Sequence, residues 1–118
     1  MKISKNENNI IIQKRKEIYF ISFLDISYIE RFGNLTIIHT DNDEIVIRFS
    51  LQKLLDFLPS FFVRSHKSYI INIKRIKQMK FLGGDSTTYE VFFNHEKSAL
   101  VTKDRISEII KEEVVNFE

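Results

Sequence analysis

The residues best suited to chemistry in this chain are basic side chains that follow one another without an intervening acid. They lie between Asp56 and Asp85, an interval with no acidic residue, and short polar residues occur among them. The basic residues are Arg64, Lys67, Lys74, Arg75, Lys77 and Lys80, and the polar residues are Ser65, His66, Ser68 and Asn72. Such side chains bind phosphate oxygens and base edges. The segment favours a polyanion-binding surface, with a solvated basic face on a β domain as the alternative.

Further basic residues follow two predicted helix starts. Lys53 comes after the predicted cap Ser50, and Lys103 and Arg105 come after the predicted cap Thr102. The N-terminus of a helix carries partial positive charge, which disfavours basic residues and attracts phosphate. These positions therefore also favour phosphate binding, with exposed lysines tolerated at a small cost as the alternative.

The sequence contains no pattern typical of catalysis or metal binding. His39, His66 and His95 have no metal-ligand spacing, and the chain has no cysteine. Residues 39–44, HTDNDE, lack the glycine and the later glutamate of a calcium loop. No phosphate-binding glycine motif or nucleophile motif occurs. We therefore expect no enzyme, no cofactor and no metal, and the lack of cysteine fits a cytoplasmic protein.

Short strands must position most of these residues. Eleven phenylalanines and many isoleucines favour β structure, and the 118 residues suit a single domain over 1–118. Strands are predicted within 9–23, 25–32, 35–40, 44–49, 61–66, 87–94 and 98–102, with a two-residue turn at Gly33-Asn34. Residues 69–80 fit a helix about as well as strands, and we favour strands. The pattern predicts a mainly β domain, because crossover helices of a parallel α/β sheet are missing.

Two short helices are predicted beside these strands. Leucines at positions 51, 54, 55 and 58 form one helical stripe, which Ser50 caps and Pro59 ends. A second helix begins after Thr102 and places Ile106, Ile109 and Ile110 on one face.

Residues 61–79, FFVRSHKSYIINIKRIKQM, resemble the signature of the LytTR-type DNA-binding domain. The matching positions are Phe62, Arg64, His66, Ser68, Tyr69, Asn72 and Ile76. Segments 25–40, 50–59 and 98–109 resemble the family's hairpin, leucine-rich helix and closing strand with helix. The resemblance spans about residues 10–113.

The resemblance implies a mainly β fold of about ten short strands in small stacked antiparallel sheets with two short helices. It also implies DNA binding through loops that enter successive major grooves. The base contacts would be Asn34, Lys67 and Lys103, and the phosphate contacts would be Ser50, Lys53, Arg64, His66, Ser68 and Arg105. Lys103 stands where the family often has arginine, so a bidentate guanine contact would be lost. Asn72 is expected to be structural and to tie a turn.

The function implied is sequence-specific binding of double-stranded DNA in bacterial transcription regulation. The chain would be the output domain of a two-component response regulator or a stand-alone regulator, with a homodimer on repeated sites as a further expectation. The alternatives are a basic β module that binds anionic membrane lipids and a small nuclease. No apolar run is long enough to span a membrane, and no secretory signal is recognisable, so no membrane association is expected.

Overall fold

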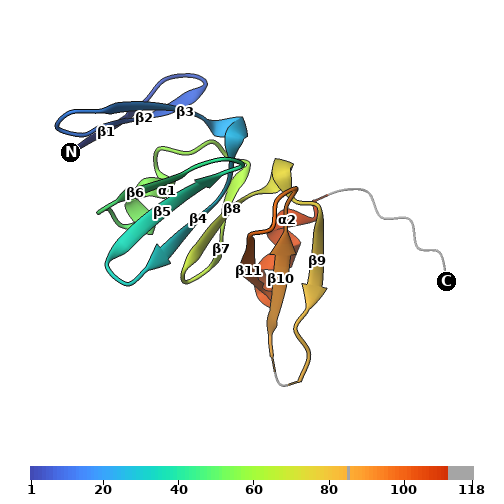
Figure 1. The fold of residues 1–118 in the computed structure, drawn as a ribbon. Coiled ribbons are helices and arrows are strands. Elements are labelled where there is room, and N and C mark those ends of the chain that lie inside the picture. The colour runs from blue at the N-terminus through green and yellow to red at the C-terminus, as the bar shows by residue number, and fades with distance from the viewer. Residues whose placement is uncertain (85, 112–118) are drawn as a thin grey trace.

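The structure, a computed structural model, describes residues 1–84 and 86–111. Within them, eleven strands form three antiparallel sheets (Figure 1). The N-terminal sheet has the order β1-β2-β3 and contains β1 (Lys2–Lys5), β2 (Asn9–Gln13) and β3 (Ile18–Ser22). The central sheet has the order β6-β5-β4-β8-β7 and contains β4 (Ile26–Phe32), β5 (Leu35–Thr40), β6 (Glu44–Ile47), β7 (Phe62–His66) and β8 (Tyr69–Asn72). The third sheet has the order β11-β10-β9 and contains β9 (Gln78–Phe81), β10 (Thr88–Phe92) and β11 (Ser98–Thr102).

Helical structure in residues 1–84 and 86–111 is confined to short segments. The two α-helices are α1 (Leu51–Leu55) and α2 (Ile106–Ile109). Three 3₁₀ turns accompany them: η1 (Phe23–Asp25), η2 (Ile73–Arg75) and η3 (Lys103–Arg105). The mainly β fold with two short helices is therefore confirmed, as are the strands within 69–80.

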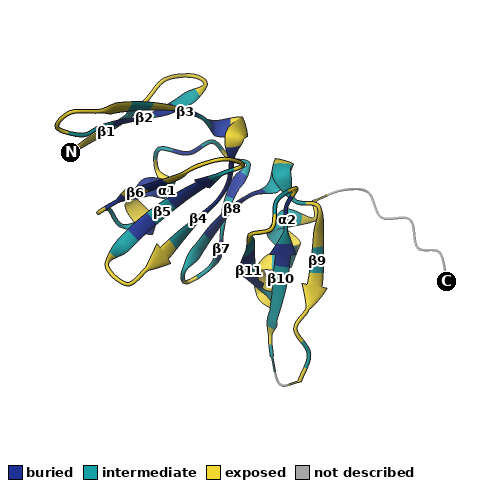
Figure 2. Cartoon of the chain, viewed as in Figure 1, coloured by how far each residue is buried: buried dark blue, intermediate teal, exposed yellow. Residues whose placement is uncertain are grey.

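Two hydrophobic clusters lie on opposite faces of the central strands (Figure 2). Ile29 and Ile70 belong to the cluster shared with the N-terminal sheet and α1. Their chain neighbours Tyr28 and Ile71 belong to the cluster shared with the third sheet and α2. Because side chains alternate along a strand, β4 and β8 contribute to both clusters and are buried on both faces.

The predicted hairpins are present, and one strand was not predicted. Gly33 has a φ of 62°, the left-handed conformation that a tight two-residue turn requires and glycine adopts readily. Phe32 pairs with Leu35 across that turn. The additional strand is β1, which pairs with β2 from Lys2 opposite Gln13 to Lys5 opposite Ile10. Its four residues, KISK, are too short and polar to show a strand period.

The first predicted helix is shorter than its leucine pattern. The Ser50 side chain accepts a hydrogen bond from the Lys53 amide at 3.0 Å, so the predicted cap is confirmed. The helix nevertheless ends at Leu55, before Pro59 is reached.

The second predicted helix differs at its start and on its apolar face. Thr102 is followed by the η3 turn and makes no side-chain cap, so that prediction is wrong. Ile106 and Ile109 pack against the core, as predicted. Ile110 is 54% exposed, so its predicted burial is wrong. The rest of the predicted helix, from residue 112 onward, lies outside the described residues.

The charge argument from helix starts stays a prediction. Lys53, whose amide donates to the Ser50 cap, lies in both the first and the last turn of the five-residue α1. Lys103 and Arg105 lie in the three-residue η3, which continues directly into α2. Segments this short have no separate ends, so a role in phosphate binding must be argued from the surroundings of these residues.

Candidate nucleic-acid interface

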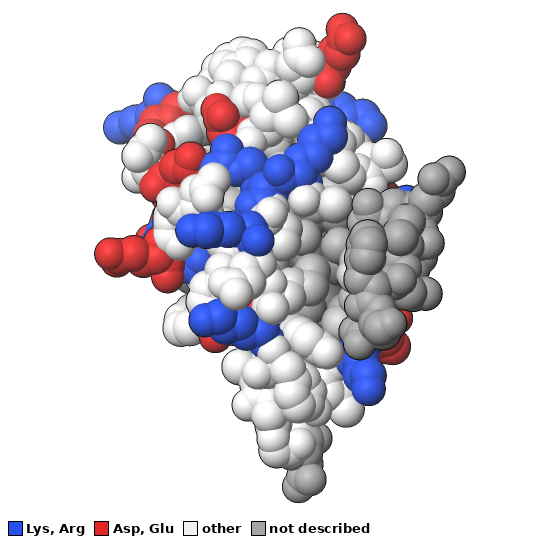
Figure 3. Space-filling view, turned by 90° about the vertical axis from the view of Figure 1, so that its right-hand side faces the viewer, with Lys and Arg blue, Asp and Glu red and all other residues white. Residues whose placement is uncertain are grey.

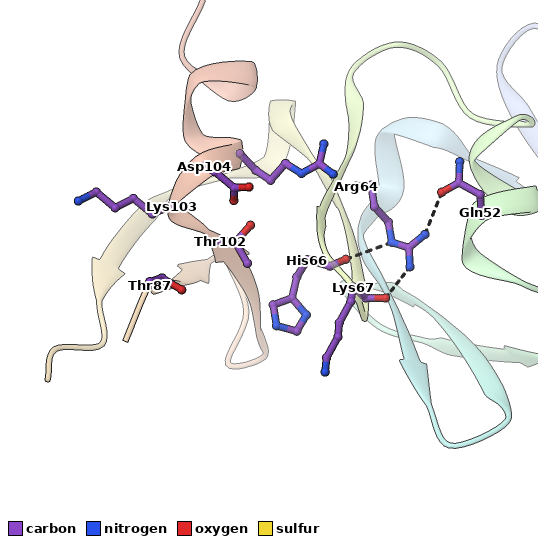
Figure 4. Close-up of a pocket in the computed structure, with 9 residues that line it drawn as sticks. Gln52, Arg64, His66, Lys67, Thr87, Thr102, Lys103 and Asp104 are labelled. Atoms are coloured by element: carbon purple, nitrogen blue, oxygen red, sulfur yellow. Dashed lines mark hydrogen bonds between the residues drawn. The ribbon is translucent and has the colours of Figure 1, made fainter. Parts of the chain in front are cut away.

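A groove of about 960 Å³ lies between the β7–β8 turn and the segment that leads from β11 into η3 (Figure 4). Five of the predicted site residues line it: Arg64, His66, Lys67, Lys103 and Arg105. The other lining residues are Gln52, Thr87, Thr102 and Asp104. Residues from two sheets and the α1 region are thus brought to one surface. We call it the basic groove.

Two strands from different sheets join the walls of the basic groove. The Ser65 hydroxyl donates a hydrogen bond to the Leu100 carbonyl at 2.8 Å, and the Thr102 hydroxyl donates one to the Ser65 carbonyl at 3.4 Å. The Lys103 amide donates to the Thr87 carbonyl at 2.7 Å, which fixes the start of η3. The sequence suggested that Ser65 is one of the residues that face phosphate. Ser65 is fully buried, so it cannot do so. It links β7 to β11 instead.

Arg64 braces the β7–β8 turn. Its guanidinium donates hydrogen bonds to the carbonyls of His66 at 3.1 Å and Lys67 at 2.5 Å, and to Gln52 Oε1 at 3.1 Å (Figure 4). Three of the five N–H donors of an arginine are thereby used within the protein. The turn that carries Lys67 is consequently held against the α1 region.

His66 is neutral and accepts a hydrogen bond within the same turn. Its Nδ1 accepts from the Ser68 amide at 3.0 Å, so the proton of the neutral ring resides on Nε2. Burial, and then the positive charges of Lys67 and Arg64, lower the pKa of His66. Its Nε2–H can therefore act as a hydrogen-bond donor without adding charge to the groove.

Positive charge dominates the lining of the groove. Arg64, Lys67, Lys103 and Arg105 are opposed by a single lining acid, Asp104. Burial and the nearby charge of Arg105 lower the pKa of Arg64, which shows that these two cations converge. Arg105 also pairs with Glu108 at 3.1 Å. Within residues 1–84 and 86–111, neither Lys67 nor Lys103 forms an ion pair, and both are exposed.

A smaller cavity of about 230 Å³ extends this surface toward β4. Its lining residues are Arg31, Ser50, Leu51, Gln52, Arg64 and Lys67, three of which also line the basic groove. The Arg31 Nε donates to the Gly33 carbonyl at 2.7 Å, so Arg31 braces the β4–β5 turn. Sequence reasoning missed Arg31 and Gln52. For Arg31, the available signal was a basic residue two positions before a predicted turn.

Some predicted site residues lie outside the two cavities. Asn34 is exposed in the β4–β5 turn, and Lys53 is exposed on α1. Ser68 is half-buried in the β7–β8 turn. Asn72 is fully buried, and its Oδ1 accepts from the Lys74 amide at 2.9 Å, so the geometry agrees with the predicted structural role.

Part of the basic charge in the acid-free interval, residues 57–84, is neutralised by contacts with other parts of the chain. Arg75 pairs with Asp41 and donates to the Leu24 carbonyl, and the Lys74 ammonium lies 4.3 Å from the centre of the Phe61 ring. On the face shown in Figure 3, basic side chains form a band across the middle and acidic ones gather mainly to one side. The interval therefore does not form a single uncompensated basic face, and its contribution to the groove comes from Arg64 and Lys67.

A serine–histidine contact outside the groove is not arranged for nucleophilic catalysis. Ser27 Oγ lies 2.7 Å from His95 Nε2, and His95 Nδ1 accepts from the Lys97 amide at 3.1 Å. The ring proton therefore resides on Nε2, and the Ser27 hydroxyl donates to the His39 carbonyl at 3.2 Å. A histidine that donates to the hydroxyl cannot act as its base.

The described part of the chain has neither a metal-binding cluster nor a membrane-spanning helix. No group of three or more histidine, cysteine, aspartate or glutamate side chains there could hold a metal ion. None of its helices is long and apolar enough to cross a membrane.

Comparisons with known proteins give a consistent result. A family model described as the LytTr DNA-binding domain matches residues 16–112. The chain is 34% identical over 98 residues to the transcriptional regulatory protein NatR of Bacillus subtilis (strain 168), an alignment that covers 82% of this chain and 42% of that protein. The chain thus spans less than half the length of this relative. A solved LytTr DNA-binding domain from Bacillus cereus has the same fold, with a TM-score of 0.73 and 18% identity over 89% of this chain and 98% of that one.

Proposed function

We propose that this chain, which belongs to the LytTr DNA-binding domain family, binds double-stranded DNA through the basic groove in transcription regulation. One observation carries this proposal: Lys67 and Lys103, from different sheets, flank one groove as exposed cations without an ion pair in the described chain. Two loops with free positive charge beside one groove suit contacts to the phosphates of a duplex.

The proposed DNA contacts are assigned by the charged or hydrogen-bonding groups that each side chain leaves unused within the protein. Lys67, Lys103 and the exposed Asn34 are proposed to reach base edges, since all three project from turns. Ser50, Lys53, His66, Ser68 and Arg105 are proposed to contact phosphate. Arg64 keeps two N–H donors for a phosphate, but its three protein hydrogen bonds make positioning of Lys67 its first role.

The length of a relative supports a place for this domain in a larger protein. NatR is named a transcriptional regulatory protein, and it is more than twice as long as the aligned segment. We propose that residues 1–118 act as one DNA-binding unit and serve as the output domain of a response regulator.

Selection from random duplex DNA, followed by affinity measurements at several salt concentrations, tests the proposal. We expect one enriched sequence and a linear fall of log K with log salt, since each neutralised phosphate adds about 0.9 to the slope. Lys67→Ala with Lys103→Ala should reduce the slope, whereas Lys2→Ala, a matched charge removal in β1, should not. A flat salt dependence, or binding to anionic vesicles without binding to duplex DNA, would overturn it.

A further inference from the structure

The N-terminal sheet ends in an edge strand whose backbone is open to a partner. In the described chain, β3 pairs only with β2. The hydrogen bonds from the Lys14 amide to Glu17 and from the Phe23 amide to Asn8 fix which residues of β3 face β2. Because hydrogen-bonded and non-hydrogen-bonded pairs alternate in an antiparallel ladder, Tyr19 and Ile21 bond to β2. The amides and carbonyls of Ile18, Phe20 and Ser22 consequently point away from the sheet.

Large apolar side chains are exposed on the same strand. Phe20 is 65% exposed and Ile18 is 58% exposed, while their neighbours Tyr19 and Ile21 pack toward the core. Leu24, just beyond the strand, is 54% exposed. An apolar strand with a free edge is a template for pairing with another strand, which proteins normally block with charge, proline or a covering segment.

The two ends of this edge carry opposite charge. The β2–β3 turn before the strand contains Lys14, Arg15 and Lys16. A groove of about 490 Å³ runs along the strand and is lined by residues 19–22, 25 and 40–45. The acids of this groove are Asp25, Asp41, Asp43 and Glu44. Asp41 is paired with Arg75 and Glu44 with Lys97, so Asp25 and Asp43 are the groove acids without an ion pair in the described residues.

An antiparallel second copy of the strand satisfies each of these features. With Phe20 opposite Phe20 of the second copy, Ile18 falls opposite Ser22, and each pair exchanges two hydrogen bonds. In this antiparallel arrangement the basic turn that precedes the strand in one chain lies toward the end of the strand that Asp25 follows in the other chain. Two-fold symmetry makes this happen twice, so that each basic turn lies beside the acidic groove of the other chain.

From this complementarity we infer that β3 joins two copies of this chain into a two-fold dimer with a continuous six-stranded sheet. The occupant is a second copy because both the charge pattern and the hydrogen-bonding residues of the strand match themselves in reverse. None of the β3 residues lines the basic groove, so the dimer would carry two separate grooves. The inference does not depend on the proposed DNA binding, and each can fail alone.

Cross-linking tests the register directly, because the chain has no cysteine. Phe20→Cys should form a disulfide-linked dimer under mild oxidation, since directly opposed residues have Cα atoms about 5.5 Å apart, within disulfide reach. Phe32→Cys is the matched control, because Phe32 is 67% exposed on β4. A mixture of Ile18→Cys and Ser22→Cys chains should cross-link faster than either chain alone, as the antiparallel direction requires.

Sedimentation of the unmodified chain over a range of concentrations gives the second measurement. We expect a monomer–dimer equilibrium, a several-fold weaker dimer with Arg15→Glu, and recovery when Asp25→Arg is added. A monomer at all concentrations, open-ended larger species, or equal cross-linking of the cysteines at positions 20 and 32 would overturn the inference. Normal duplex binding by monomeric variants would leave the proposed function intact.

Discussion

Arg64 and Lys67 lie three residues apart, yet only Lys67 has its whole charged group free for a ligand. The guanidinium of Arg64 holds the backbone of His66 and Lys67 and the side chain of Gln52, whereas Lys67 is exposed beside the basic groove. A basic residue that is fixed by the protein sets geometry, and a free one supplies contact. The two should therefore respond differently to substitution.

Lys67→Ala should relax the preference for one base pair by about 1–3 kcal/mol, because a single base contact is lost. Arg64→Ala should weaken binding to all sequences and also relax that same preference, because the turn that presents Lys67 loses its brace. Affinities for a set of single-base operator variants distinguish these outcomes. If Arg64→Ala lowered the salt slope by about 1 with the preference unchanged, Arg64 would be a simple phosphate ligand.

Lys103→Glu should abolish specific binding, because a favourable contact is replaced by repulsion from phosphate. It should leave the melting temperature almost unchanged, since Lys103 is exposed and forms no ion pair within the described residues. Lys2→Glu in β1 provides the control for charge reversal. Melting and duplex affinity measured together check the prediction, which a normal operator affinity for Lys103→Glu would contradict.

At the scale of elements, Asn72 ties two segments that are far apart in the sequence, residues 23–26 and residues 72–74. Its Nδ2 donates to the carbonyls of Phe23 at 3.3 Å and Ile26 at 2.8 Å, and its Oδ1 caps η2 through the Lys74 amide. The residue is fully buried, so these partners cannot turn to water if it is removed.

Asn72→Ala should therefore cost at least about 1–3 kcal/mol of unfolding free energy, the penalty for a buried group left without its hydrogen bond. Asn42→Ala, at an exposed position between β5 and β6, is the control and should change stability little. Urea denaturation of both variants provides the measurement. Equal stability of the two variants would show that the buried asparagine is dispensable.

Local patterns in the sequence predicted most of the elements and only part of the site. The alternation in residues 45–49 and the Gly33-Asn34 turn act over a few residues, and both predictions are confirmed. The extent of the helices was mispredicted. The amides of residues 56–58 bond three rather than four residues back, so the α-helical pattern ends at Leu55, and Ile110 is exposed. The basic groove joins β7 to β11 through residues more than thirty positions apart, as Ser65 and Leu100 show, and no local pattern reports such a contact.

At the scale of the whole molecule, all three histidines are held toward their neutral form. Burial is the main cause that lowers the pKa of His39, of His66 and of His95. The Glu30 carboxylate, 2.6 Å from His39 Nε2, opposes this effect without reversing it. In the unfolded chain the three imidazole rings have the ordinary histidine pKa of 6.5.

Stability should therefore fall as the pH falls from 7 toward 5, because the unfolded chain binds more protons than the folded one over that range. A histidine whose pKa is lowered by folding contributes stability above the pKa of the unfolded state. That stability is lost as the pH falls toward the pKa of the folded state. His95→Gln should make this dependence shallower. Denaturation midpoints measured between pH 5 and 8 check the sign, and greater stability at pH 5 than at pH 7 would contradict it.

The central strands β4 and β8 contribute to both hydrophobic clusters, and this has a consequence for how the molecule opens. Separating an outer sheet from the middle sheet would expose one cluster to water, and it would also uncover one face of β4 and β8. The amide hydrogens of Ile29, Ile70 and Ile71 should then exchange with solvent only through global unfolding, while those of β1 and β9 exchange through smaller local openings. Exchange rates would thus rank the strands by their distance from the middle sheet, with the turns beside the basic groove among the fastest.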